Sequence, residues 1–351
     1  INEAASRTAV ALTHRNFRLL WMGALTSSIG TWMQKVAQAW LIVTLTGSSS
    51  AFYLGLDSFA GEAPILLFTI LGGVVADRRD RRHMMLMSQY IQMTVAFVLA
   101  GLVLTNVVQV WMVIGLSVIT GLAQAFGGPA YQSLIPTLVG KDHLPNAIAL
   151  NSIQFNLARV IGPVVAGVAL ASFGMVACFG LNGISFLFVI AAIFALRDVH
   201  IPPVATDGIV NQMRDGLRFV KHSRSLIRVM ILGFIVAFLG FPLLTFLPVI
   251  TKDVFHQDVG FYSRLMTFSG AGAVTGALFV AYLGKHRHID RLLLGSLFLF
   301  GGAMAVFSVS RHAESSAIVL FIAGSLLVMC TSLTTSLAQL LAPPNRNSEP
   351  S

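Results

Sequence analysis

Long apolar stretches alternate with short polar segments along this chain of 351 residues. At a rise of 1.5 Å per residue, a helix of about 20 apolar residues crosses a hydrocarbon core of about 30 Å. The pattern therefore predicts about ten membrane-spanning helices, six before a central polar segment and four after it. The expected spans are residues 17–45, 51–76, 83–104, 110–139, 145–172, 175–196, 226–250, 261–283, 289–310 and 315–341.

The composition indicates the same class of protein. The sequence is 56% hydrophobic and only 11% charged, and its mean hydropathy is +0.79. A net charge of +9 on a soluble domain would suggest a nucleic-acid partner, but here the basic residues lie mostly in the segments between apolar stretches. We therefore expect an all-α polytopic membrane protein that is surrounded by lipids and binds no nucleic acid.

The distribution of charge predicts the orientation in the membrane. If the N-terminus is cytoplasmic, nearly every Lys and Arg outside the spans falls on the cytoplasmic side, and only Lys252, Arg264 and Arg311 fall on the other. Basic loops favour the cytoplasmic side of a membrane. We expect a multi-pass protein whose N-terminus and central linker are cytoplasmic.

The central polar segment divides the chain. Pro202 and Pro203 end any helix that continues from the sixth span. Apolar residues then recur at helical spacing opposite basic ones, which fits either an amphipathic helix on the inner membrane surface or an ordinary solvated linker helix. The predicted domains are an N-terminal six-helix bundle (1–197), a cytoplasmic linker (198–225) and a C-terminal four-helix bundle (226–351).

Motifs of several other protein classes are missing from the sequence. It contains neither a phosphate-binding Gly-x-x-x-x-Gly-Lys-Ser/Thr loop nor a His-Glu-x-x-His motif. Cys178 and Cys330 lie singly within apolar stretches and are expected to be small packing residues. We expect no metal, no cofactor and no enzyme activity, and the lack of a filter-like repeat disfavours a channel.

A basic motif follows the second predicted span. It reads Gly73-Val-Val-Ala-Asp77-Arg78-Arg79-Asp80-Arg81-Arg82. A basic cluster at this place is often only a topology anchor. The pattern Gly-x-x-x-Asp-Arg-x-x-Arg-Arg nevertheless resembles the signature between spans two and three of the major facilitator superfamily. It departs from the family at Asp80, where many relatives carry Gly.

This resemblance implies a transporter of two helical halves that moves a small molecule by alternating access. It also implies that Asp77 and Arg81 form a conformational latch at the inner face. The halves of the family have six spans each, whereas the second half here is predicted to have four. We therefore expect an incomplete transporter that lacks the last two helices, and a monomer. The alternative is a truncated or degenerate membrane protein that transports nothing.

The fifth predicted span contains a second motif, in which Gly162, Pro163 and Gly167 are the key positions. It resembles the Gly-Pro-x-x-Gly-Gly signature of the family's drug and proton antiporters, with Ala166 in place of one Gly. Small residues allow close helix approach, and Pro bends a helix by removing a backbone donor. A generic Gly/Pro kink is the alternative interpretation.

Two further stretches, residues 16–21 and 144–151, resemble the branch of the superfamily that contains the enterobactin exporter and macrolide-efflux proteins. This resemblance implies export of an amphiphilic small molecule, drug-like or siderophore-like. It further implies proton antiport across a bacterial inner membrane.

Charged residues inside the predicted spans are the main candidates for function. They are Lys35, Asp57, Glu62 and Arg159, and each costs roughly 2.5–3.5 kcal/mol at the bilayer centre on insertion scales. Lys35, Glu62 and Arg159 lie at similar depth, about 15–20 Å from the outer helix ends. We predict that Glu62 pairs with Lys35 or Arg159 and carries the coupled proton, because opening the site to either face would change its desolvation and its interaction with the cation. A structural ion pair is the alternative.

Polar residues at helical spacing suggest a substrate cavity. A polar stripe on a membrane helix forms either a cavity wall or a helix–helix contact. The presence of Lys35 on the first such helix favours the cavity. The candidates are Thr31, Gln34 and Gln38 in the first span, Gln124 and Tyr131 in the fourth, and Asn151 and Gln154 in the fifth.

Overall fold

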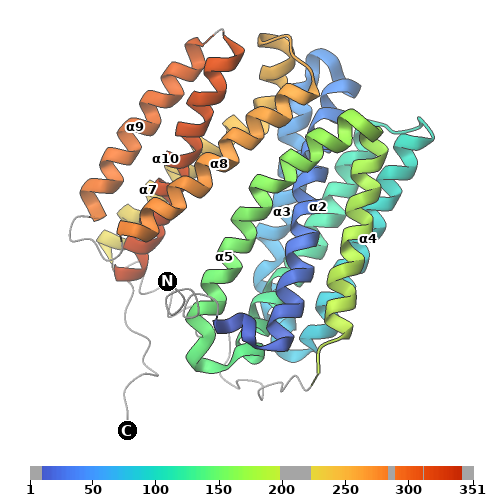
Figure 1. Cartoon of the computed structure of the whole chain (residues 1–351), viewed down its shortest axis with the longest axis vertical. Coiled ribbons are helices and arrows are strands. Elements are labelled where there is room, and N and C mark those ends of the chain that lie inside the picture. Colours follow the sequence, from blue (N-terminus) through green and yellow to red (C-terminus); the bar gives the residue numbers. More distant parts are fainter. Residues whose placement is uncertain (1–9, 198–222, 284–288, 311, 342–351) are drawn as a thin grey trace. The chain divides into compact units, whose positions relative to one another are not determined.

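A computed structural model describes residues 10–197, 223–283, 289–310 and 312–341, and every regular element in these ranges is a helix (Figure 1). The all-α prediction is confirmed. By length and composition, eight of the described helical segments can cross a membrane, and two of these, 15–76 and 142–194, are 62 and 53 residues long. The predicted count of about ten depends on how these long segments are divided and stays a prediction.

The first compact unit contains Ile1–Ala205 together with Thr245–Arg264. In its described part, α2, α3 and α4 each pack against α5, and their buried side chains form one core that includes Phe17, Leu134 and Ile193 (Figure 1). The elements are η1 (Val10–Thr13), α2 (Arg15–Thr46), η2 (Gly47–Ser49), α3 (Ser50–Arg78), α4 (Arg81–Leu104) and α5 (Val110–Phe194).

Two glycines break α5. Gly140 and Gly174 have φ values of 73° and 75°, in the left-handed region that glycine adopts without a steric penalty. The breaks fall where the sequence predicted the ends of the fourth and fifth spans. Each expected turn is therefore present as a non-helical break between consecutive helical segments of α5.

The second compact unit contains Thr206–Leu244 and Leu265–Ser351. In it, α9 and α10 lie side by side around a core that includes Leu293, Leu327 and Cys330 (Figure 1). Cys178 and Cys330 are both free and buried, as packing residues would be. The remaining elements of the chain are α7 (Arg224–Val249) and α8 (Val259–Leu283), which both units share, the π-helical turn η3 (Ile250–Val254), which belongs to the first unit, and α9 (Ile289–Val309) and α10 (Ala313–Leu341) of the second.

Glycines set the closest helix approaches in both units. A Cβ added at Gly121 of α5 would overlap the backbone oxygen of Gly61 in α3. A Cβ added at Gly272 of α8 would overlap the backbone oxygen of Phe321 in α10. Small residues allow membrane helices to pack in this way. The same device thus holds one helix pair in each unit.

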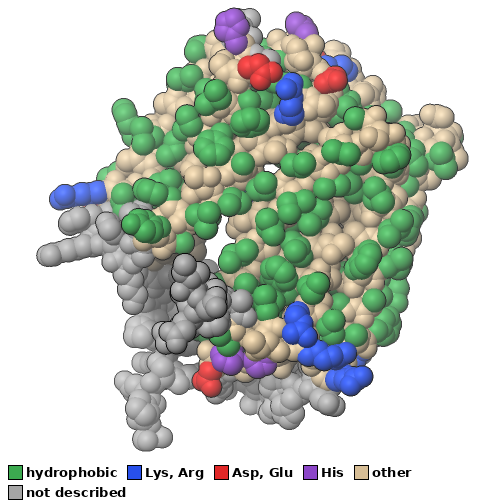
Figure 2. Space-filling view, in the orientation of Figure 1, with side chains coloured by type: hydrophobic (Ala, Val, Ile, Leu, Met, Phe, Trp, Pro, Cys, Tyr) green, Lys and Arg blue, Asp and Glu red, His purple; other side chains and the backbone are tan. Residues whose placement is uncertain are grey.

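The helix flanks are covered by apolar side chains. Leu66 on α3 is 81% exposed and Phe298 on α9 is 83% exposed. Figure 2 shows hydrophobic side chains over the helices of this face, with basic side chains gathered at the lower end of the first unit. Such a surface suits contact with lipid chains rather than water, in agreement with a multi-pass membrane protein.

The predicted linker lies almost wholly outside the described residues. Its amphipathic stretch falls on residues 209–224, of which only 223 and 224 are described. The predicted domain boundaries, 1–197, 198–225 and 226–351, therefore stay a prediction.

Candidate functional site

Two cations lie over one indole ring in the first unit. Lys35 Nζ lies 5.2 Å from the centroid of the Trp32 ring, and both residues are on α2. Arg159 on α5 places its guanidinium carbon 5.7 Å from the same ring. Phe155, one turn before Arg159, meets Trp32 edge-to-face with the ring centroids 6.0 Å apart. We call Trp32, Lys35, Phe155 and Arg159 the Trp32 cluster.

Glycine brings α5 close enough to α2 for this cluster to form. A Cβ at Gly162, one turn after Arg159, would overlap the Cβ of Trp32. A Cβ at Gly167 would lie 3.0 Å from the Cβ of Ser263 in α8, tighter than ordinary contact. The close approach expected from these small residues is therefore present at both glycines. The antiport role of the motif around Pro163 stays a prediction.

Asp57 on α3 accepts hydrogen bonds from neutral donors. Gln38 Nε2 on α2 donates to both carboxylate oxygens, at 3.1 and 3.0 Å. Ser117 Oγ on α5 donates to Asp57 Oδ1 at 2.5 Å and accepts from Gln38 Nε2 at 3.0 Å. The three side chains thus connect three helices. Asp57 itself is half-buried.

A second polar network joins the two sides of the break at Gly140. The hydroxyl of Tyr131 donates to Asn151 Oδ1 at 2.7 Å and lies 3.3 Å from Gln154 Oε1. Gln154 Nε2 then donates to Ser28 Oγ on α2 at 2.9 Å. The structure thus brings together three of the candidates predicted from sequence.

The other polar candidates contact neighbouring helices or their own. Gln34 Oε1 accepts from Asn182 Nδ2 of α5 at 2.7 Å. Gln124 Oε1 accepts from Gln92 Nε2 of α4 at 3.4 Å. Thr31 donates to a carbonyl of its own helix. Gln34 therefore takes part in a helix–helix contact, the alternative that the sequence left open, and a cavity-lining role for these residues stays a prediction.

Glu62 is not brought to either membrane cation. Its side chain is exposed on α3, and neither Lys35 nor Arg159 forms an ion pair with any described residue. The position of a residue along its helix determines its depth in the membrane, but the rotation of the helix about its axis determines which neighbours the side chain meets. Glu62 lies on the same side of α3 as the exposed Phe59 and Leu66. The expected pairing is absent from the described part of the chain, while the proton-coupling role of Glu62 stays a prediction.

The arginines at the start of α4 bind backbone carbonyls of α5, and Arg82 does so at a helix end. Arg81 Nη1 donates to the carbonyl of Ser133 at 3.1 Å. Arg82 Nη2 donates to the carbonyl of Phe194, the last residue of α5, at 3.0 Å. Cations near a helix C-terminus interact favourably with its free carbonyls and dipole. The two side chains therefore fix α4 to neighbouring segments of the first unit.

Asp80, the departure from the family motif, begins α4. Its Oδ1 accepts from the backbone N–H of Arg82 at 2.9 Å, which is N-cap geometry. Gly73 has open space where a Cβ would stand. The side chains of Asp77 and Arg78 lie outside the part of the structure described, so the predicted latch stays a prediction.

The start of α2 binds the end of α5. Arg15 Nη1 donates to the carbonyl of Ala195 at 3.2 Å. Asn16 Nδ2 donates to the carbonyl of Arg197 at 2.6 Å. Arg15 and Asn16, the first residue of the 16–21 stretch, thus close the first unit at one end, which is a structural role.

Sequence reasoning missed the aromatic members of the Trp32 cluster. Trp32 precedes Lys35 by three residues and Phe155 precedes Arg159 by four, so each ring lies one helical turn from a membrane cation. This spacing was the available signal, because such a pair can form a cation–π contact. Ser117 and Asn182 offered no comparable signal.

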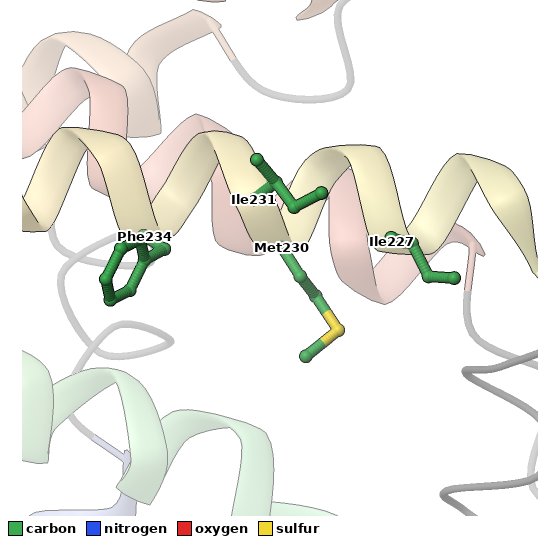
Figure 3. Close-up of a pocket in the computed structure, with 4 residues that line it drawn as sticks. All are labelled: Ile227, Met230, Ile231 and Phe234. Atoms are coloured by element: carbon green, nitrogen blue, oxygen red, sulfur yellow. The ribbon is translucent and has the colours of Figure 1, made fainter.

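The described residues offer no group suited to a metal ion, and a shallow pocket on the second unit is of a different kind. No group of three or more His, Cys, Asp or Glu suited to a metal ion occurs among them. Figure 3 shows the pocket, which is lined by Ile227, Met230, Ile231 and Phe234 along α7. It contains no polar side chain that could orient a ligand, so the first unit remains the better candidate site.

The chain is similar to several curated bacterial transporters. It is 25% identical to the staphyloferrin A transporter of Staphylococcus aureus (strain NCTC 8325 / PS 47) over 280 residues, 79% of this chain and 69% of that protein. It is 23% identical to macrolide efflux protein A of Streptococcus pyogenes, over 83% of this chain and 72% of that protein. It is 22% identical to the enterobactin exporter of Salmonella choleraesuis (strain SC-B67), over 95% of this chain and 80% of that protein.

The fold is similar to solved transporter structures. A crystal structure of a bacterial homologue of the human lysosomal transporter Spinster, inward-facing and unoccupied, matches with a TM-score of 0.70 at 14% identity. The match covers 93% of this chain and 78% of that one. Residues 6–345 match the transmembrane secretion effector family, nearly the whole chain. The chain therefore belongs to the transmembrane secretion effector family of the major facilitator superfamily, whose members are membrane transporters and not enzymes.

Proposed function

We propose that this transporter exports an amphiphilic small molecule from the bacterial cytoplasm and couples export to proton entry. The observation that supports export is the family match, since the relatives include proteins named for macrolide efflux and enterobactin export. Alternating access between the two faces of the membrane would carry the molecule outward while a proton moves inward.

We place the proton on Asp57, with Glu62 as the second candidate. A coupling carboxylate must exist in both protonation states without losing its partners. The hydroxyl of Ser117 donates to the carboxylate now and, after rotation, can accept from a protonated acid, because a hydroxyl is both donor and acceptor. Gln38 donates to either oxygen, so it retains an acceptor in both states.

Reconstitution of the full chain in proteoliposomes tests this function. The probes are erythromycin, the anionic dye carboxyfluorescein and the cationic dye rhodamine 123, and uptake is measured after filtration and lysis at fixed pH. An acid interior drives protons outward, so we expect it to accelerate uptake of at least one probe. No gradient-driven uptake of any probe would contradict the exporter and support a membrane protein that transports nothing.

Three variants locate the proton. Asp57→Asn should reduce gradient-driven uptake to the level of empty liposomes, while Asp142→Asn, which removes an exposed carboxylate, should retain it. If Glu62→Gln removes the gradient dependence and Asp57→Asn does not, the carrier is Glu62, as the sequence first suggested. Equal loss in Asp142→Asn would indicate a general effect of charge and no specific carrier.

A further inference from the structure

The Trp32 cluster brings two positive charges together over one aromatic ring. Lys35 is exposed and Arg159 is half-buried, and each lies over the face of Trp32. Neither forms an ion pair with any described residue. An aromatic ring attracts a cation but supplies no counter-charge. The cluster is therefore a positively charged site in which both cations lie against the Trp32 ring.

Both cations lie far from the ends of their helices, so neither side chain can reach the water at the membrane surface by extending along the helix. Lys35 lies eleven residues before the end of α2 and Arg159 fifteen before the break at Gly174, or about 16 and 22 Å along the axis. Charged side chains at this depth are rare, pair with other groups, and mark substrate or ion pathways. Two cations this far inside their helices, neither in an ion pair with a described residue, indicate that counter-charge comes from a bound molecule.

Asp57 does not supply the missing charge. It interacts electrostatically with Lys35, but its direct partners are the neutral Gln38 and Ser117. One carboxylate can offset at most one of the two cations. Arg159 forms no ion pair with any described residue, so at least one full positive charge remains for a ligand.

The chemistry of the four side chains limits the class of ligand. Lys and the Arg guanidinium bind carboxylate and phenolate oxygens through charge-assisted hydrogen bonds. The ring of Phe155, which is 56% exposed, offers a surface on which an aromatic ring can stack. We propose that the Trp32 cluster is a binding site for organic anions that contain an aromatic ring, and that Lys35 and Arg159 bind the anionic group. This inference rests on the proposed export function and narrows its substrate to anions.

Equilibrium binding to the purified full chain tests the site without any gradient. The probes are carboxyfluorescein and rhodamine 123, two dyes of similar ring system and opposite charge, followed by fluorescence anisotropy. The wild type should bind carboxyfluorescein more tightly than rhodamine 123. Lys35→Gln and Arg159→Gln should each weaken carboxyfluorescein binding by about tenfold, the loss typical of one charge-assisted contact, and should leave rhodamine binding unchanged or stronger.

Two further variants separate a binding role from a structural one. Arg228→Gln removes an exposed charge from the second unit and should not change the binding of either dye. Arg159→Lys keeps the charge and should restore part of the carboxyfluorescein affinity that Arg159→Gln loses. A wild type that does not prefer carboxyfluorescein, or anion binding unaffected by Lys35→Gln and Arg159→Gln, would overturn the proposal.

The outcomes also separate this proposal from the exporter. Gradient-driven uptake of rhodamine 123 but not carboxyfluorescein would overturn the anion site and leave the export function standing. Selective binding of carboxyfluorescein without gradient-driven uptake of any probe would support the site and contradict the export function.

Discussion

The two compact units share a packing device and differ in where they carry charge. Both bring a pair of helix backbones together through glycine, at Gly121 in the first unit and Gly272 in the second. The described Lys, Arg, Asp and Glu residues of the second unit all lie at helix ends. The first unit adds four charges well inside its helices: Lys35, Asp57, Glu62 and Arg159.

This difference separates the residues that pack the helices from the residues expected to act in transport. Close glycine contacts are sufficient to pack apolar helices, and both units have them. Charges inside a membrane helix oppose insertion and require a reason in function or pairing. We therefore expect substitutions at the charges of the first unit to alter transport with little change in stability. Substitutions at the glycines should reduce stability in either unit.

The largest expected effect concerns the latch predicted at Asp77. Asp77→Asn should keep expression and abolish most transport, because a carboxylate at the end of α3 can accept from Arg side chains and from backbone N–H groups at a helix start. Asp290→Asn changes a carboxylate in the first turn of α9, in the second unit, and should retain transport. Probe uptake into proteoliposomes measures both, and normal transport by Asp77→Asn would remove the latch.

The next effect tests whether the two units depend equally on glycine. Gly121→Ala and Gly272→Ala should each destabilise the protein by about 1–3 kcal/mol, the usual cost of overpacking. Gly115→Ala and Gly295→Ala add the same methyl group in open space and should be neutral or slightly stabilising. Thermal unfolding in detergent measures the four variants. A neutral Gly272→Ala would indicate that only the first unit is tightly packed.

The smallest effect concerns Asp80, which caps α4. Asp80→Ala should cost about 1 kcal/mol of stability, whereas Asp80→Gly should cost only a few tenths, because glycine is tolerated at an N-cap. Transport should be retained in both variants, since Asp80 stabilises the start of α4 and lies outside the membrane-spanning part of the helix. Thermal unfolding ranks the two, and an equal cost for both would indicate that the cap is not what Asp80 contributes.

The sequence predicted most of the fold because membrane spans leave a strong signal. Apolar length alone located the helices, and Gly140 and Gly174 lie where turns were expected. Depth along a helix was also readable, and it put Lys35, Glu62 and Arg159 at one level, of which the structure brings Lys35 and Arg159 to Trp32. Rotation about the helix axis was not readable, so Glu62 was paired with cations that the structure places over Trp32 instead.

The hydrogen-bond partners of the polar residues could not be predicted from the sequence either. The network of Asp57 needs Gln38 and Ser117, which are 19 and 60 residues away in the chain. A Ser or Gln in an apolar stretch has the same local pattern whichever helix it faces. Contacts of this kind follow from the packing of three helices, and no spacing within one helix indicates them.

The contacts between the start of α2 and the end of α5 have a consequence for biosynthesis. Asn16 and Arg197 are 181 positions apart, so a ribosome must complete and release the whole first half before they can meet. Domains generally fold as units during synthesis, and closing a longer loop costs only slightly more entropy than closing a shorter one. We therefore expect the end of the first unit that Asn16 and Arg197 close to remain open until residue 197 leaves the translocon. It should then become resistant to protease in a single step.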